Sequence, residues 1–425
     1  MRSGWRTWGT AFIALTVLGG AGSGPLLGSD PPPAAKVEPL PRRVEPNPHQ
    51  AVRMLAALQE RIADGSSEAL ATMGDLSREI GKRLAAFDAS VWDDARYREV
   101  LLKYVLSGGE PGLVKELIAR KKFKEEERRL ARGVVAYVYG DRPQAASALA
   151  GIDPRGLSPS LGGHVALLTA VLLADENPRR ALELCNESRL LSPGTLVEEA
   201  ALRLTIELAI TTGDLATFKA AVMRHMRRFP NSLYSRVIDL RIARVLAAHR
   251  YNAAGDARLL SVLSNPHLPI ERRQFLFSEL ADAGLRAANK EMAGIGARYL
   301  RAVVTSSSPA MAKSKAIEAA VAVLTRKSSQ ADKLIDETVA AKPEKDVLAL
   351  LGELETLSAI INAPPQKIDL NAESVREVQD PSPPMPSDQV GSIRDTTIAA
   401  RIEETIVKAE AKFSTVEKLL SEAGS

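Results

Sequence analysis

The chain has 425 residues, of which 45% are hydrophobic, 25% are charged and only 4% are aromatic, and its formal net charge is +4 at pH 7. Few aromatic residues argue against a large β-sandwich or barrel, because strands favour β-branched and aromatic side chains, whereas Ala and Leu suit closely packed helices. The near-neutral charge, with acids interleaved among the bases, excludes the clustered basic surface of a nucleic-acid binder.

The first 21 residues have the pattern of a secretory signal peptide. Arg2 and Arg6 precede a short apolar run over 11–18, and residues 19–21 are the small residues of a cleavage site. The run is far shorter than the roughly 20 residues that span a bilayer. We therefore expect export to the periplasm and a mature chain without a transmembrane span. An uncleaved anchor is the alternative.

Two proline-dense stretches divide the rest of the chain. Eight prolines fall in the stretch that ends at Pro48, and six fall between Pro364 and Pro386. Proline breaks helices, so these stretches are predicted to be disordered linkers. The predicted organisation is a signal peptide at 1–21, a linker at 22–48, a helical body at 49–362, a second linker at 363–392 and a C-terminal helix at 393–425.

The body carries helical periodicity almost throughout. One apolar stripe joins Val197, Ala200, Ala201, Leu204 and Leu208, with Glu198 expected on the exposed side. The same periodicity predicts helices at 49–63, 67–87, 91–106, 125–139, 160–174, 214–228, 231–249, 269–287, 290–304, 308–326 and 343–361.

Prolines punctuate the body at a regular period. Pro154, Pro193, Pro230, Pro269, Pro309 and Pro343 follow one another at intervals of 34 to 40 residues, a period typical of helix–turn–helix solenoids. Over about 125–345 the detail resembles tetratricopeptide repeats, in which a small residue opens the second helix and a proline follows it.

Seven positions carry this likeness to tetratricopeptide repeats. Ala181 and Pro193 have the expected spacing of twelve positions, Phe218 and Pro230 keep it with a larger first residue, and Gly133, Gly140 and Ala145 fit an earlier unit. The predicted fold class is all-α, a tetratricopeptide-like solenoid of helical hairpins. An irregular helical bundle is the alternative.

The sequence lacks the usual signatures of catalysis or metal binding. The five histidines form no paired zinc motif, Gly162-Gly163 lacks the lysine of a phosphate loop, and no nucleophile elbow occurs. The single cysteine, Cys185, lies on a predicted apolar helix face and is expected to be a buried thiol that forms no disulfide. We therefore expect no enzyme activity, metal, cofactor or small-molecule substrate. A peptidoglycan-processing enzyme that relies on another catalytic domain is the alternative from that class.

The predicted C-terminal helix has an apolar seam suited to packing against another helix. It either folds back on the body or docks on a partner, and the positions that would bind are Ile398, Ile402, Ile406, Phe413, Val416 and Leu420.

The layout resembles one family, the periplasmic motility protein MotC of rhizobium-type bacteria. The resemblance rests on the exported proline-rich N-terminus, the helical body and two segments, Leu196–Ala209 and Arg227–Tyr234. It implies a non-enzymatic periplasmic protein that is required for flagellar rotation and binds the periplasmic part of the stator subunit MotB. An exported scaffold for cell-envelope assembly is the second interpretation.

Overall fold

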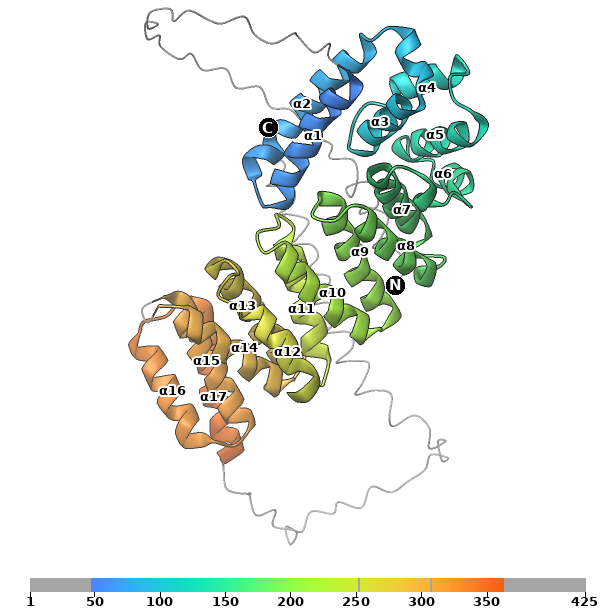
Figure 1. Ribbon diagram of the computed structural model, residues 1–425. Coiled ribbons are helices and arrows are strands. Elements are labelled where there is room, and N and C mark those ends of the chain that lie inside the picture. Colours follow the sequence, from blue (N-terminus) through green and yellow to red (C-terminus); the bar gives the residue numbers. More distant parts are fainter. Residues whose placement is uncertain (1–46, 251–252, 306–307, 363–425) are drawn as a thin grey trace, which may run out of the picture. The chain divides into compact units, whose positions relative to one another are not determined.

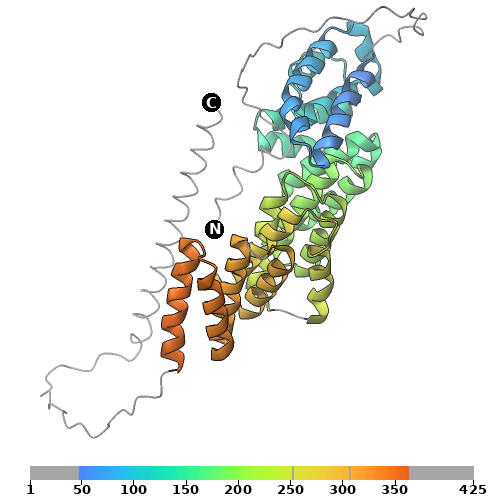
Figure 2. The same ribbon diagram turned by 90° about the vertical axis from the view of Figure 1, so that its left-hand side faces the viewer.

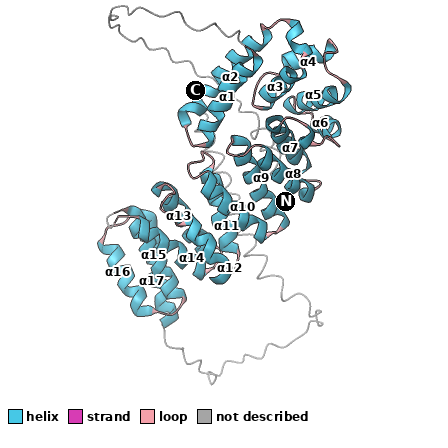
Figure 3. Cartoon of the chain, viewed as in Figure 1, coloured by secondary structure: helices cyan, strands magenta, loops and turns pink. Residues whose placement is uncertain are grey.

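The structure is a computed structural model that describes residues 47–250, 253–305 and 308–362 (Figure 1). All of them belong to one compact unit, and the residues of a second unit lie outside the described ranges. The described ranges contain seventeen α-helices, two short 3₁₀ helices and no strand (Figure 3). The all-α prediction is confirmed. None of the described helices is both long and apolar enough to cross a membrane.

The helices follow one another with short connections. In chain order they are α1 (Pro48–Ala63), α2 (Ser67–Ala85), η1 (Ala89–Asp93), α3 (Ala95–Leu106), α4 (Gly112–Ala119), α5 (Glu125–Val138), α6 (Arg142–Leu149), η2 (Pro154–Gly156), α7 (Pro159–Leu173), α8 (Pro178–Leu191), α9 (Leu196–Thr212), α10 (Leu215–Arg228), α11 (Ser235–Ala248), α12 (Ala253–Leu263), α13 (Ile270–Arg286), α14 (Lys290–Val303), α15 (Pro309–Leu324), α16 (Ser328–Ala340) and α17 (Lys345–Asn362).

The helices predicted in the body all occur, with small shifts at their ends, and the helix predicted at 393–425 lies outside the described residues. The helix predicted at 91–106 is instead η1 followed by α3, because the Asp94 side chain accepts a hydrogen bond from the Arg96 amide at 2.9 Å and caps a new helix there. Five helices, α4, α6, α8, α12 and α16, were not among the predicted ranges, although Cys185 of α8 was expected on a helix. Of these, α6, α8 and α16 complete pairs that are described next.

A hairpin repeat runs through most of the body. Neighbours pack as pairs, α5 with α6, α7 with α8, α9 with α10, α13 with α14 and α15 with α16. The leading helices begin 34 to 39 residues apart, at Glu125, Pro159, Leu196, Ser235, Ile270, Pro309 and Lys345. This agrees with the period expected from the prolines. At the end of the described chain, α15, α16 and α17 lie side by side (Figures 1 and 2).

Small residues let the paired helices approach closely. A Cβ on Gly133 of α5 would lie 2.9 Å from Leu149 of α6, and one on Gly163 of α7 would lie 2.0 Å from the Ser192 hydroxyl after α8. Ala181 and Phe218 are buried near the starts of α8 and α10, as their repeat positions require. Gly162-Gly163 is therefore a packing feature of a helix.

The apolar core is divided along the chain. One cluster gathers residues between Val52 and Leu208, a second covers Ile206 to Leu300, and a third joins α15, α16 and α17. This division is typical of repeat arrays, in which a unit packs mainly on its neighbours.

The hairpin of α1 and α2 makes a long-range contact with the middle of the body. Ala63, Leu202 and Phe229 form a small buried cluster, and α1 contacts α9. Gly65, in the turn between α1 and α2 at φ +98°, lies so close to the loop after α10 that a Cβ would be 2.2 Å from the Asn231 carbonyl oxygen. As a result α9 is buried around most of its circumference.

This burial makes one expectation wrong. Glu198 was placed on an exposed face but is only 5% exposed. Its carboxylate accepts hydrogen bonds from the Gly194 amide at 2.6 Å and from Arg228 at 2.8 Å. A carboxylate can be buried at this site because both donors compensate for the water that it loses.

Changing Leu208 to Ala is expected to lower the free energy of unfolding by about 2–5 kcal/mol, because the residue is fully buried and the change leaves a cavity. Changing Leu190 to Ala, at a side chain that is 77% exposed, should alter it by no more than about 0.5 kcal/mol. Urea unfolding followed by circular dichroism measures both. Equal losses would contradict the described packing of α9.

Candidate functional site

The predicted partner-binding positions lie outside the described residues. Those positions, Ile398, Ile402, Ile406, Phe413, Val416 and Leu420, therefore stay predictions. The described residues do bring together the two segments that carry the family resemblance. Leu196–Ala209 forms most of α9, and Arg227–Tyr234 forms the end of α10 and the loop that follows.

A buried carboxylate lies at the centre of this junction. Glu199 is fully buried, and its Oε2 accepts a hydrogen bond from the Arg203 guanidinium at 2.8 Å. Burial alone would raise the pKa of Glu199, but Arg203 and hydrogen bonds from His225 and Ser232 lower it to about 2. Glu199 is therefore ionised at neutral pH, and it joins α9, α10 and the loop after α10.

The histidine of this cluster is held neutral. His225 is fully buried, its Nε2 lies 3.1 Å from Glu199 Oε1, and its Nδ1 has no hydrogen-bond partner. Burial lowers the pKa of His225, and the charges of Arg272 and Arg203 lower it further, against the opposing effect of Glu199. The neutral ring thus donates from Nε2 to the carboxylate. The sequence shows no paired zinc motif that includes His225, so its place in this cluster was not predicted.

The three residue types of this cluster also occur in hydrolase triads, but the geometry differs. The Ser232 hydroxyl lies 2.8 Å from Glu199 Oε1, the same oxygen that His225 contacts. In a triad the histidine must lie between serine and carboxylate, so that it can take the hydroxyl proton. Here the carboxylate lies between them, and all three side chains are buried. The cluster therefore has a structural role, because its buried side chains are not accessible to a substrate.

A second buried ion pair extends the junction to α13. The Arg272 guanidinium contacts both carboxylate oxygens of Asp239 at 3.0 Å and donates to the Pro230 carbonyl at 2.8 Å. Burial raises the pKa of Asp239, which Arg272 opposes. On the outer side, the Arg203 guanidinium lies 3.8 Å from the centre of the Tyr234 ring. The junction therefore ties four helices to one loop.

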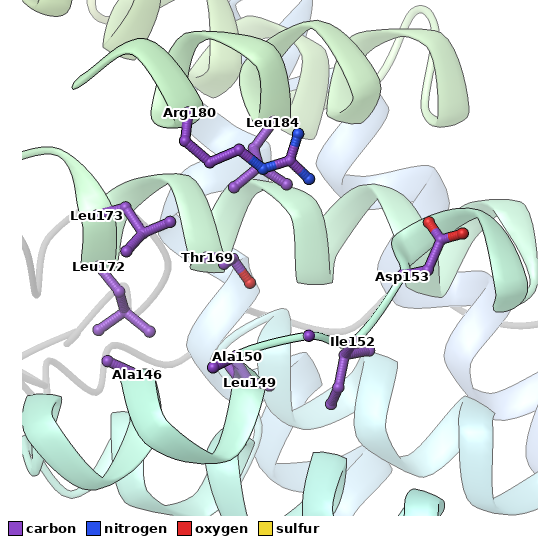
Figure 4. A pocket seen from close by; sticks show the side chains of 11 residues that line it. Ala146, Leu149, Ala150, Ile152, Asp153, Thr169, Leu172, Leu173, Arg180 and Leu184 are labelled. Atoms are coloured by element: carbon purple, nitrogen blue, oxygen red, sulfur yellow. The ribbon is translucent and has the colours of Figure 1, made fainter. Parts of the chain in front are cut away.

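An open apolar groove lies between the paired helices further toward the N-terminus. It has a volume of about 410 Å³, and α6, α7, α8 and the loop after α6 line it. Figure 4 shows Leu149, Leu172 and Leu173 along its walls, with Arg180 and Asp153 as the charged groups. Arg180 is paired with Glu183 at 2.7 Å. Such a groove suits aliphatic side chains of a protein partner.

The described residues offer little for metal or thiol chemistry. They contain no group of three His, Cys, Asp or Glu side chains placed to hold a metal ion. Cys185 is a free cysteine, as expected, and it is fully buried in α8. Burial raises its pKa to about 12, so it stays a thiol at neutral pH.

Comparison with known proteins identifies relatives. The family model described as "Chemotaxis protein MotC" matches residues 4–425. The chain is also 25% identical over 326 residues to the chemotaxis protein MotC of Rhizobium meliloti (strain 1021), an alignment that covers 73% of this chain and 74% of that relative. No solved structure matches the chain.

Proposed function

Because the chain belongs to the chemotaxis protein MotC family, whose model spans nearly its full length, we propose that it is a non-enzymatic motility protein that works on the flagellar motor in the periplasm. The extent of the family match is the observation that carries this proposal. The predicted signal peptide at 1–21 supports the compartment, since it directs export.

The partner in this proposal is the periplasmic part of the stator protein MotB. A stack of helical hairpins offers long faces that suit protein segments. The apolar groove beside α7 is one such surface among the described residues. The seam of the predicted C-terminal helix is the other docking element, through Ile402 and Phe413 among its apolar positions.

The buried junction supports a binding role over a catalytic one. Its charged groups form ion pairs with one another, Glu199 with Arg203 and Asp239 with Arg272. The pair of Asp239 with Arg272 joins α11 to α13, and Glu199 joins α9 to α10 through His225. They thereby provide a stable frame for surfaces that bind a protein.

Deleting the gene is expected to leave flagella assembled but unable to rotate, and the wild-type gene supplied in trans should restore swimming. Complementation with Ile402→Asp/Phe413→Asp should fail, because charges on the apolar seam weaken docking. Lys412→Asp, at a polar position of the same predicted helix, is the matched control and should restore swimming. Soft-agar motility and tethered-cell rotation measure the effect.

Two outcomes of the deletion experiment separate the interpretations. Normal swimming of the deletion strain would end the motor proposal and leave the cell-envelope scaffold. Loss of flagella would point to an assembly role instead.

The periplasmic fraction should contain a protein that lacks residues 1–21, as mass spectrometry of its N-terminus can show. An intact Met1 in the cytoplasmic fraction would contradict export.

A further inference from the structure

A second cavity lies where α1, α3 and α7 meet. Its volume is about 560 Å³, and it opens to solvent. It shares α7 with the apolar groove described above but none of the same lining residues. The polar side chains that line this cavity are Asn47, His49, Gln50, Arg53, Arg96, Glu99, Lys103, Ser158 and Ser160.

Two cations of this lining, Arg53 and Lys103, form no ion pair within the described residues. Arg96 is paired with Asp94 at 2.7 Å. Among the described residues, Glu99 is the carboxylate that lines the cavity, and Glu60 acts on Lys103 without forming an ion pair.

The starts of two helices add to the positive potential. Asn47 caps α1, and Ser158 precedes α7 without capping it through its side chain. Neither helix has an acidic residue in its first turn. Each helix start carries about half a positive charge, which adds to the charges of Arg53 and Lys103, while Glu99 and Glu60 offset part of the sum. The remaining positive potential favours an anion.

A bound anion would stabilise the charged form of Lys103, which is partly buried. Burial lowers the pKa of Lys103, and Glu60 opposes this only in part. Its charge in turn adds to the lowering of the pKa of the buried His164 nearby. An ammonium that has lost water without gaining a counter-ion is unfavourable. An anion in the cavity would supply that counter-ion.

We propose that the cavity between α1, α3 and α7 binds an oxyanion, a phosphate or a pair of carboxylates, through Arg53, Lys103 and the starts of α1 and α7. Arg96, already paired with Asp94, borders the site. Glu99 disfavours anions of higher charge. This inference does not depend on the role in motility.

The test uses the mature full-length chain at constant ionic strength, with isothermal titration calorimetry. The probes are inorganic phosphate, succinate and a short polyglutamate peptide. Arg53→Gln/Lys103→Gln should weaken binding at least about tenfold, since it removes two charge-assisted contacts. Arg78→Gln/Lys82→Gln removes the same charge from exposed positions of α2 and should bind like the wild type.

A second measurement separates binding from a structural role. Without an anion, Lys103→Gln should melt at the same temperature as the wild type or higher, because it removes a partly desolvated charge. Phosphate should raise the melting temperature of the wild type but not of this variant.

The outcomes show whether the bound group is a free anion or an acidic protein segment, or they overturn the proposal. Binding of phosphate or succinate supports a free anion, and binding of the peptide alone supports an acidic segment. No binding by any probe overturns the proposal. Equal weakening by the α2 control, or a lower melting temperature for Lys103→Gln, would also overturn it.

Discussion

Replacing Arg272 with Ala is expected to lower the free energy of unfolding by about 3–5 kcal/mol, one of the largest losses available to a single change in this chain. The change leaves the Asp239 carboxylate, which is fully buried, without its counter-ion, and it leaves the Pro230 carbonyl without its donor. Urea unfolding at pH 7, followed by circular dichroism, measures the loss.

Two further variants make this result specific to burial. Arg78→Ala removes an arginine that pairs with Asp75 at an exposed site and should cost no more than about 1 kcal/mol. Arg272→Met/Asp239→Leu removes both buried charges and should recover much of the loss. If the double variant is less stable than Arg272→Ala, the pair contributes more than charge compensation.

Acidification is expected to destabilise the body well before its carboxylates are protonated. Burial lowers the pKa of His164 to about 4, whereas its ordinary value is 6.5. Between pH 6.5 and 4, His164 is therefore protonated in the unfolded chain and neutral in the folded chain. The stability due to a neutral His164 is complete above pH 6.5 and is lost as the pH falls toward 4, by about 3 kcal/mol. His225 acts in the same direction.

The pH dependence can be assigned to one residue. In His164 the Nδ1 lies 2.7 Å from the Ser160 carbonyl, so His164→Asn keeps a donor near that position. The free energy of unfolding of this variant should fall less between pH 6.5 and 4 than that of the wild type. His267→Asn, at an exposed loop residue, should leave the profile unchanged. Parallel profiles for wild type and His164→Asn would show that burial of His164 is not the cause.

The helices could be predicted where their apolar residues form a regular stripe. The helix predicted at 290–304 occurs as α14, where Met292, Ile295 and Leu300 are buried. The apolar stripe does not predict α6, because this helix has only 8 residues and its buried residues are Ala145 and Leu149. Short helices with small side chains give too weak a periodicity to separate them from a turn.

The buried charges could not be predicted, because they depend on which segments meet. Glu199, His225 and Ser232 are each unremarkable in the sequence, since an acid, a histidine and a serine are common on helix faces. Glu199 is buried where α10 and the loop after it bring His225 and Ser232 onto its carboxylate. Periodicity predicts the face of one helix; it does not predict the partner that covers the opposite face.

The contact of the turn at Gly65 with Asn231 imposes an order on folding. Most contacts of the body join neighbouring hairpins, which can form as soon as each hairpin has been made. The hairpin of α1 and α2 is different, because the surface that it covers on α9 and at Phe229 comes much later in the chain. Until those residues are synthesised, the apolar side of α1 has no native partner there, and it needs protection from aggregation.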